Sequence, residues 1–234
     1  EGTVFFPNEP ILEVAGDLIS AQMLESYVLN ILGFSIITAS LGTRMVLAAR
    51  GVDLVEFGLR RAQSPIAGFR AVRGAQMAGF KATSNIFAAK LLDFPCTGTM
   101  AHSFVEVFQS EEKAFEEFAN MYGENAVFLI DTYESIEGIT KAAKIVKKFY
   151  EEKNIKIKGI RIDSDHLEKL SKFARNHFSE QGVPFMKIFV SGDLDEYRIE
   201  DLINNGAEID GIGIGTRFTV SKYAPSLDIV YKIV

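Results

Sequence analysis

The chain has 234 residues, of which 47% are hydrophobic and 24% charged, enough to bury a sizeable core. Its formal net charge of −6 argues against a nucleic-acid partner, which needs a basic face. The single cysteine, Cys96, excludes an internal disulfide and a multi-cysteine metal site, and it is compatible with the cytoplasm, where we expect the protein. No uninterrupted apolar run of about 18 residues predicts a membrane span.

The first 50 residues predict two short strands and two helices. Apolar pieces at 4–6 and 11–14 are broken by prolines, a pattern typical of edge strands. Asp17 opens an amphipathic pattern that Gly33 would end, and a second helix is predicted over about 35–50. The apolar run 228–234 resembles an unfinished strand, and the chain starts without Met. We therefore expect the central part of a longer polypeptide.

From residue 53 onward, predicted strands and helices alternate. Strands are predicted at 53–58, 95–99, 126–130, 156–162, 185–190 and 209–214, with a polar strand end or loop at 81–85. Helices are predicted at 66–80, 86–92, 103–121 (one helix or two), 135–153, up to 181 and up to 205. This alternation predicts an α/β fold with a parallel sheet, and its six or seven units suit a barrel better than a doubly wound open sheet.

Polar residues follow most of these predicted strands. In a parallel barrel the carboxyl ends of the strands meet at one face, where barrel enzymes place their chemistry. The residues that we expect to line this mouth are Arg60, Ser84, His102, Asp131, Arg161, Asp163, Asp193 and Gly213. Each has a structural alternative: a lone histidine is often structural, and Asp163 and Ser164 could cap the helix that follows them.

Two features of the predicted mouth favour an anionic, phosphorylated substrate. The stretch 211–216 (GIGIGT) fits the phosphate site that barrels place after their last strands, because glycines let backbone N–H groups approach an anion. Arg60, Arg61 and Arg161 supply forked donors, whereas Arg44 and Arg217 are predicted to form surface salt bridges. The aspartates at the mouth could hold Mg²⁺, sugar hydroxyls or the His102 ring.

Eight stretches of the chain, in this order, resemble nicotinate phosphoribosyltransferases: EGTVFFPNEP (1–10), EFGLRRAQSP (56–65), TSN (83–85), GTMAHSF (98–104), IDTYES (130–135), RIDSD (161–165), SGD (191–193) and GIGT (213–216). The resemblance implies an irregular, roughly seven-stranded TIM-like α/β barrel over 35–226, with fragments of a second α+β domain at the chain ends. Residues 1–34 would belong to that split domain and its linking helix, and 227–234 would begin its return strand. A homodimer or higher homo-oligomer with shared active sites is implied as well.

The resemblance also implies a reaction and a role for each matching residue. Nicotinate and phosphoribosyl pyrophosphate (PRPP) would give nicotinate mononucleotide and pyrophosphate, with Mg²⁺ accompanying PRPP and with ATP as co-substrate. His102 would become a phosphohistidine whose ring Asp131 orients, and Arg60, Arg61, Arg161 and Ser103 would bind nicotinate. The residues implied to bind ribose or phosphate are Thr83, Ser84, Asn85, Asp163, Ser191, Gly192, Asp193, Gly213, Gly215 and Thr216.

Three alternatives stay open at this point. A sister phosphoribosyltransferase could use quinolinate, which has two carboxylates and should want more cationic groups, or nicotinamide, which has none. A barrel isomerase or aldolase acting on another phosphosugar would fit the glycine-rich strand end. A non-catalytic ligand-binding relative could keep the pocket without the chemistry, although His102, Asp131 and Asp163 argue against it.

Overall fold

The computed structural model describes residues 2–234, so Glu1 lies outside the described part. Its elements are α1 (Leu18–Met23), α2 (Glu25–Ala48), β1 (Asp53–Glu56), η1 (Leu59–Arg61), α3 (Pro65–Ala78), β2 (Ala82–Thr83), α4 (Ile86–Leu92), α5 (His102–Glu106), α6 (Glu111–Tyr122), η2 (Gly123–Asn125), β3 (Val127–Leu129), α7 (Ser135–Lys153), β4 (Gly159–Ile162), α8 (Leu167–Glu180), β5 (Lys187–Val190), α9 (Glu196–Asn204), β6 (Gly211–Ile214) and α10 (Thr216–Thr219). The predicted α/β class is confirmed.

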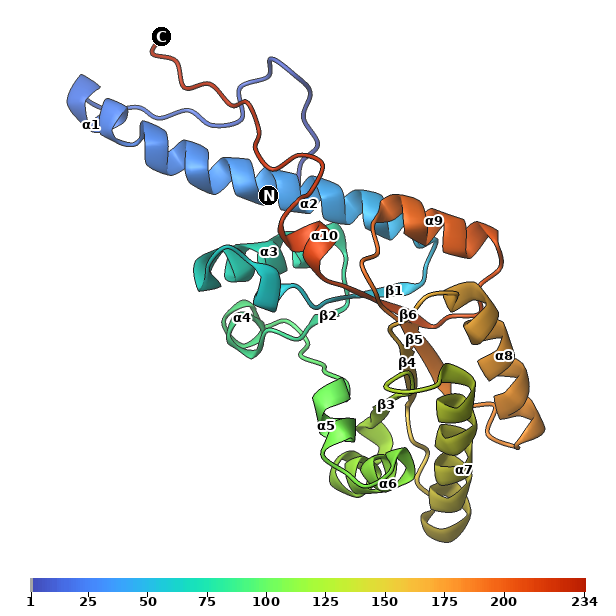
Figure 1. Ribbon diagram of the computed structural model, residues 1–234. Helices are drawn as coiled ribbons and strands as arrows, with labels where there is room; N and C mark the ends of the chain where they lie inside the picture. The colour runs from blue at the N-terminus through green and yellow to red at the C-terminus, as the bar shows by residue number, and fades with distance from the viewer. Residues whose placement is uncertain (1) are drawn as a thin grey trace.

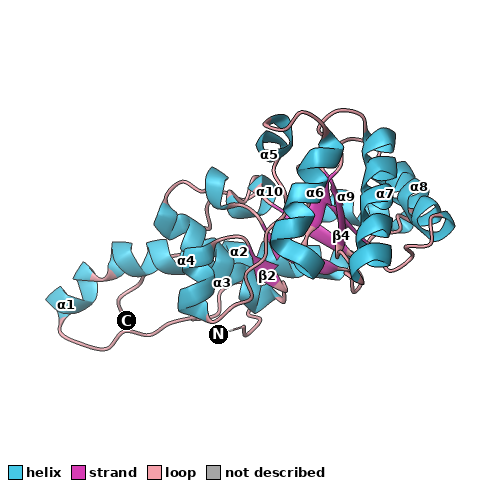
Figure 2. Ribbon diagram, turned by 90° about the horizontal axis from the view of Figure 1, so that it is seen from below, coloured by secondary structure: helices cyan, strands magenta, loops and turns pink. Residues whose placement is uncertain are grey.

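The centre of the molecule is a curled sheet of six parallel strands in the order β2-β1-β6-β5-β4-β3 (Figure 1). Helices cover the outside of this sheet, and α7 and α8 lie beside one another near β3 and β4 (Figures 1 and 2). The strands are apolar and buried, as strands covered on both faces must be, with Ile160, Ile188 and Ile212 fully buried. The predicted strands at 53–58, 126–130, 156–162, 185–190 and 209–214 are each present in shorter form.

The predicted strand at 95–99 is wrong. The segment makes one isolated parallel bridge, between Cys96 and Thr83, and no strand. Pro95 has no N–H to give to a ladder, and it contributes only its carbonyl, which accepts the N–H of Thr83 at 3.0 Å. On its other side the segment reaches β3, where the Met100 N–H donates to the Val127 carbonyl at 3.2 Å. The regular sheet therefore has six strands, and an irregular segment runs between its two edges.

The strands predicted near the chain ends are also wrong, because residues 4–6, 11–14 and 228–234 contain no strand. A strand needs a partner, and no ladder forms beside these segments within the described residues. Asp17 does cap α1, as predicted, by accepting the Ser20 N–H at 3.0 Å. Gly33 does not end a helix: α2 passes through it without a break, so the predicted domain division at 34/35 falls inside α2.

Helix α2 is long and apolar enough to cross a membrane when judged by length and composition alone, with a mean hydropathy of 1.6 over an 18-residue stretch. The sequence reading missed it because polar residues interrupt the apolar run. One such helix is weak support for a membrane span, since core helices of soluble proteins share these properties. Ile37 and Met45, in its C-terminal half, are buried against the rest of the molecule.

Candidate functional site

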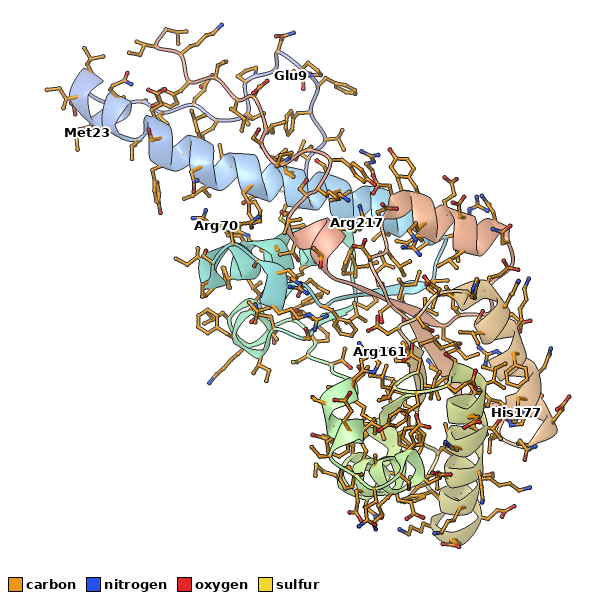
Figure 3. The ribbon with its side chains drawn as sticks, in the orientation of Figure 1. Glu9, Met23, Arg70, Arg161, His177 and Arg217 are labelled. Carbon is orange, nitrogen blue, oxygen red and sulfur yellow. The ribbon has the colours of Figure 1, made fainter. Side chains whose placement is uncertain are left out.

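The residues predicted at the mouth do gather at the carboxyl ends of the strands, because all six strands are parallel. Asp131 and Asp163 follow β3 and β4, Ser191 follows β5, and Gly215 follows β6. Figure 3 shows Arg161 in the middle of the molecule, between the α3–α4 side and the α5–α6 side. The carboxyl-terminal end of the sheet thus carries a cation and two carboxylates, and the His102 imidazole lies beside them at the start of α5.

Two neighbours hold the His102 ring, one at each nitrogen. Nδ1 lies 3.2 Å from the Thr132 hydroxyl oxygen, and Nε2 lies 3.8 Å from Asp163 Oδ2. The expectation that Asp131 orients the ring differs from this geometry, because Asp131 Oδ2 instead accepts the backbone N–H of Asp163 at 2.6 Å. Asp131 therefore acts on the ring only through the position of Asp163, and Thr132 makes the direct contact.

Asp163 joins three elements of the site. Its Oδ1 accepts a hydrogen bond from the Ser191 hydroxyl at 2.8 Å, and its Oδ2 lies 3.9 Å from an Arg161 terminal nitrogen. The Gly192 backbone, with φ +115°, passes close by, since a Cβ there would lie 3.6 Å from Asp163 Oδ1. Ser191 and Asp163 thus link β4 to β5, and Asp163 keeps one oxygen facing the imidazole.

Arg161 is a largely buried guanidinium, with its side chain 15% exposed and some of its donors unused. A terminal nitrogen donates to the Met100 carbonyl at 3.3 Å, while Nε is buried and finds no acceptor within residues 2–234. Burial lowers the pKa of Arg161, the charges of Asp163 and Asp131 oppose that shift, and the nearby charge of Arg60 adds to it. Arg60 therefore lies close enough to Arg161 for their charges to interact, beside the two carboxylates of Asp163 and Asp131.

The predicted site residues that follow β1 and β2 differ in their exposure to solvent. Arg60 and Arg61 lie exposed on η1. Thr83 and Asn85 are buried and already bonded: the Thr83 hydroxyl donates to Glu56 and Asn85 caps α4 through the Ala88 N–H. Their side chains are therefore not free for ribose or phosphate, contrary to expectation, and Ser84 alone of the three is partly open.

The β5 and β6 ends differ from expectation at two positions. Asp193 is tied to Arg217, whose Nε donates to Asp193 Oδ1 at 2.8 Å, and this bond lowers the pKa of the carboxyl. The predicted ion pair of Arg217 is confirmed, and it occupies the carboxylate expected to bind ribose. Gly213 is buried, and a Cβ there would lie 2.5 Å from the Phe57 ring, so this glycine serves packing. Gly215 and Thr216 remain open, as does Ser103 beside His102.

Sequence reasoning missed two contacts that build this site, namely Thr132 beside the imidazole and Glu56 beneath η1. Thr132 lies in the stretch 130–135, next to the expected partner Asp131. Their position after a strand does not by itself show which of the two contacts the His102 ring. Glu56 had a usable signal: it is a carboxylate inside an apolar strand, and such a group needs donors when it is buried. Asp163 and Ser164 do not cap α8, whose first capping position is His166.

The fold and this edge define an α/β protein whose ligand site lies at the carboxyl ends of parallel strands. A model of the nicotinate phosphoribosyltransferase (NAPRTase) family matches residues 52–233. Nicotinate phosphoribosyltransferase pncB2 of Mycobacterium tuberculosis is 41% identical over 234 residues, covering 100% of this chain and 50% of that protein. For the nicotinate phosphoribosyltransferase of Bacillus subtilis the identity is 38%, covering 100% of this chain and 47% of that protein.

The solved structures agree with these sequence matches. The crystal structure of human nicotinic acid phosphoribosyltransferase aligns with a TM-score of 0.78 at 26% identity, over 92% of this chain and 54% of the human chain. The chain belongs to the nicotinate phosphoribosyltransferase (NAPRTase) family. It spans about half the length of the curated relatives that it matches.

Proposed function

We propose that the whole protein is a nicotinate phosphoribosyltransferase, converting nicotinate and PRPP to nicotinate mononucleotide and pyrophosphate in NAD biosynthesis or salvage. Family membership and identities of 38–41% to two bacterial nicotinate phosphoribosyltransferases support this reaction. The observation that carries the proposal is the cluster of His102, Arg161 and Asp163 at the strand ends. It brings together an imidazole, a buried cation and a carboxylate where an anionic substrate would bind.

Each open group has a part in this reaction. The pyridine nitrogen displaces pyrophosphate from the ribosyl carbon through a transition state that resembles an oxocarbenium ion, which calls for positioning and charge stabilisation. Arg60 pairs with the nicotinate carboxylate, and the Arg161 guanidinium lies against the pyridine ring or the departing pyrophosphate. Asp163 approaches the ribose, and Gly215 and Thr216 take phosphate at the end of β6.

His102 is proposed as a phosphate carrier that takes a phosphoryl group from ATP and loses it to water in each cycle. Thr132 engages Nδ1, which leaves Nε2, on the Asp163 side, as the nitrogen facing the strand ends. After incubation of the whole protein with ATP we expect acid-labile, base-stable phosphate. The label should be absent in His102→Ala and retained in His177→Ala, whose histidine lies on α8, away from Arg161 (Figure 3). Turnover that ignores ATP would remove this role.

Mg²⁺ would accompany the pyrophosphate group of PRPP. Mg²⁺ commonly binds through one or two carboxylates together with substrate phosphates and water. The buried Oδ1 of Asp131, which has no hydrogen-bond partner among the described residues, fits such a donor. In the part of the chain that the structure describes, no group of three or more His, Cys, Asp or Glu side chains could hold a metal ion by itself. The metal's part would be to neutralise charge on the leaving pyrophosphate.

The deciding experiment offers nicotinate, nicotinamide and quinolinate in parallel to the whole protein with PRPP, with and without ATP, and identifies the nucleotide formed. We expect nicotinate mononucleotide. A product from quinolinate or nicotinamide alone would assign the protein to a sister reaction, and no product from any of the three would leave another phosphosugar reaction or a ligand-binding role.

We propose further that the protein is cytoplasmic and that it is a homodimer or higher homo-oligomer. Light scattering of the whole protein measures the number of subunits.

A further inference from the structure

The carboxylate of Glu56 is buried at the end of β1, directly below η1. Its residue is 1% exposed, and both of its oxygens accept hydrogen bonds, Oε1 from the Gly58 N–H and Oε2 from the Thr83 hydroxyl at 2.6 Å. A buried carboxylate is costly unless donors satisfy it, so these bonds fix both donors firmly in place. Glu56 is therefore bonded both to Gly58, which precedes η1, and to Thr83 on β2.

The bond to Gly58 determines where η1 begins. Gly58 is the capping residue of η1, and its carbonyl accepts the Arg61 N–H at 2.9 Å in the turn that carries Arg60. Gly58 packs closely against α10, because a Cβ on it would lie 1.6 Å from the Thr219 hydroxyl oxygen and 2.9 Å from Glu56 Oε1. The glycine is held between the carboxylate and α10, and the direction of η1 follows from that position.

The bond to Thr83 extends the same control to β2. The Thr83 oxygen also accepts the Asn85 N–H at 3.0 Å, and the Glu56 carbonyl accepts the Ser84 N–H at 2.9 Å. One residue thus sets the relative positions of Arg60, on η1, and Ser84, after β2. Arg60 is exposed and Ser84 is partly open, so both side chains remain available at this corner of the site.

We propose that Glu56 is a positioning residue that sets Arg60 and Ser84 for the pyridine carboxylate, an inference that rests on the proposed function. Glu56 touches no substrate and acts through η1 and the end of β2. Its loss affects the affinity for nicotinate, whereas the strand ends near His102 and Asp163, on the other half of the sheet, keep their geometry. This is a determinant of substrate binding rather than of phosphoryl transfer.

The test is Glu56→Gln in the whole protein, which keeps the size of the side chain but presents an amide N–H₂ to one of the two donors. We expect KM for nicotinate to rise about tenfold, with kcat and KM for PRPP changed less than about twofold, as the loss of one bond to a charged group predicts. The matched control is Glu111→Gln, a glutamate that is 2% exposed and pairs with Lys141 away from the site. The control should leave both KM values unchanged.

A double-mutant cycle with Arg60→Ala separates positioning from general destabilisation. If Glu56 acts through Arg60, Glu56→Gln should add less than about twofold to KM for nicotinate in the Arg60→Ala background. Additive effects, or an equal rise of both KM values, would overturn the inference. Wild-type protein that forms no nicotinate mononucleotide would instead refute the proposed function.

A second variant pair keeps the test valid if Glu56→Gln fails to fold. Thr83→Val removes the hydroxyl donor to Glu56 with little change of shape, and Thr83→Ser retains it. We expect Thr83→Val to raise KM for nicotinate selectively and Thr83→Ser to restore the wild-type value within about twofold. Equal values for the two variants would overturn the inference.

Discussion

Thr132 is the side chain that meets Nδ1 of His102, and its hydroxyl is the group by which the ring's direction can be tested. Thr132→Val removes that contact and keeps the shape. We expect phosphate incorporation at His102 to fall about fivefold, the equivalent of one neutral hydrogen bond of about 1 kcal/mol. Thr132→Ser should incorporate phosphate like the wild type. Equal incorporation in all three proteins would mean that the ring is held by Asp163 alone.

Arg60 and Arg61 are adjacent, exposed cations on η1, but only Arg60 contributes to the shifted pKa of Arg161. Arg60→Ala should therefore raise KM for nicotinate about 10- to 100-fold and leave KM for PRPP nearly unchanged, since hydrogen bonds between charged groups contribute about 1.5–3 kcal/mol. Arg61→Ala is the matched control, with an expected change below about threefold. Equal losses for both substrates would show that Arg60 binds phosphate instead.

Burial raises the pKa of Glu56 above its ordinary 4.5, while the hydrogen bonds from Thr83 and Gly58 oppose that shift. A carboxyl whose pKa is raised on folding stabilises the protein fully below pH 4.5, and that contribution is lost as the pH rises through the raised pKa. Glutamine does not titrate. The unfolding free energy of Glu56→Gln relative to wild type should thus increase from about pH 4 to about pH 8 in urea titrations. A constant difference would contradict the raised pKa.

At the scale of elements, α7 packs on the end of β3 through Gly138. A Cβ there would lie 1.8 Å from the backbone oxygen of Ile130, which cannot withdraw as a flexible side chain can. In α2, a Cβ on Gly33 would make an ordinary contact at 3.7 Å with Ile229. A methyl group added by substitution to alanine would therefore clash with backbone at Gly138 but fit at Gly33.

We expect Gly138→Ala to lower the unfolding free energy by about 1–3 kcal/mol, because the helix must move away from β3. Gly33→Ala should raise it by up to about 1 kcal/mol, since alanine favours a helix and no neighbour obstructs it. Thermal and urea unfolding measure both. A stabilising Gly138→Ala would show that α7 can shift without cost.

Helices were the elements that the sequence predicted best, because their signals are local. Asn85 before 86–92 caps α4, and Ser64 with Pro65 opens α3, so their bounds follow from neighbouring residues. The segment 95–99 has strand-like residues, but its pairing depends on the proline and on edges that are distant in sequence. The choice of Thr132 over Asp131 as the ring's neighbour likewise depends on how three strand ends meet, which no local pattern records.

For the molecule as a whole, α1, the start of α2 and the two chain ends form an arm (Figure 1), and many of the exposed large apolar side chains belong to it. Figure 3 shows Met23 at the outer end of this arm. Ile19 and Met23 are 73% and 79% exposed. An exposed apolar surface of this kind marks an interaction site, and the matched relatives are about twice as long as this chain.

We expect further chain or a second copy to cover this arm in the whole protein. Ile19→Asp should then lower its unfolding free energy by about 2 kcal/mol or more, the scale of burying one large apolar side chain. Met121→Asp, at a 66% exposed position on α6, is the control and should change it by less than about 0.5 kcal/mol. Equal, small effects would show that the arm stays in solvent.

The irregular segment 95–100 has a consequence for the timing of chemistry. It is held to β2 by hydrogen bonds between Thr83 and residues 95 and 97, and to β3 by one bond from Met100, and two residues later the chain reaches His102. A backbone segment with so few hydrogen bonds opens locally more readily than a strand that is paired along its whole length. If this segment separates from β2 and β3, we expect the imidazole to leave Thr132 and Asp163 together, so the proposed phosphate carrier would be lost well before the sheet unfolds. We therefore expect the proposed ATP coupling to be lost at temperatures or denaturant concentrations that leave the helical circular dichroism signal unchanged.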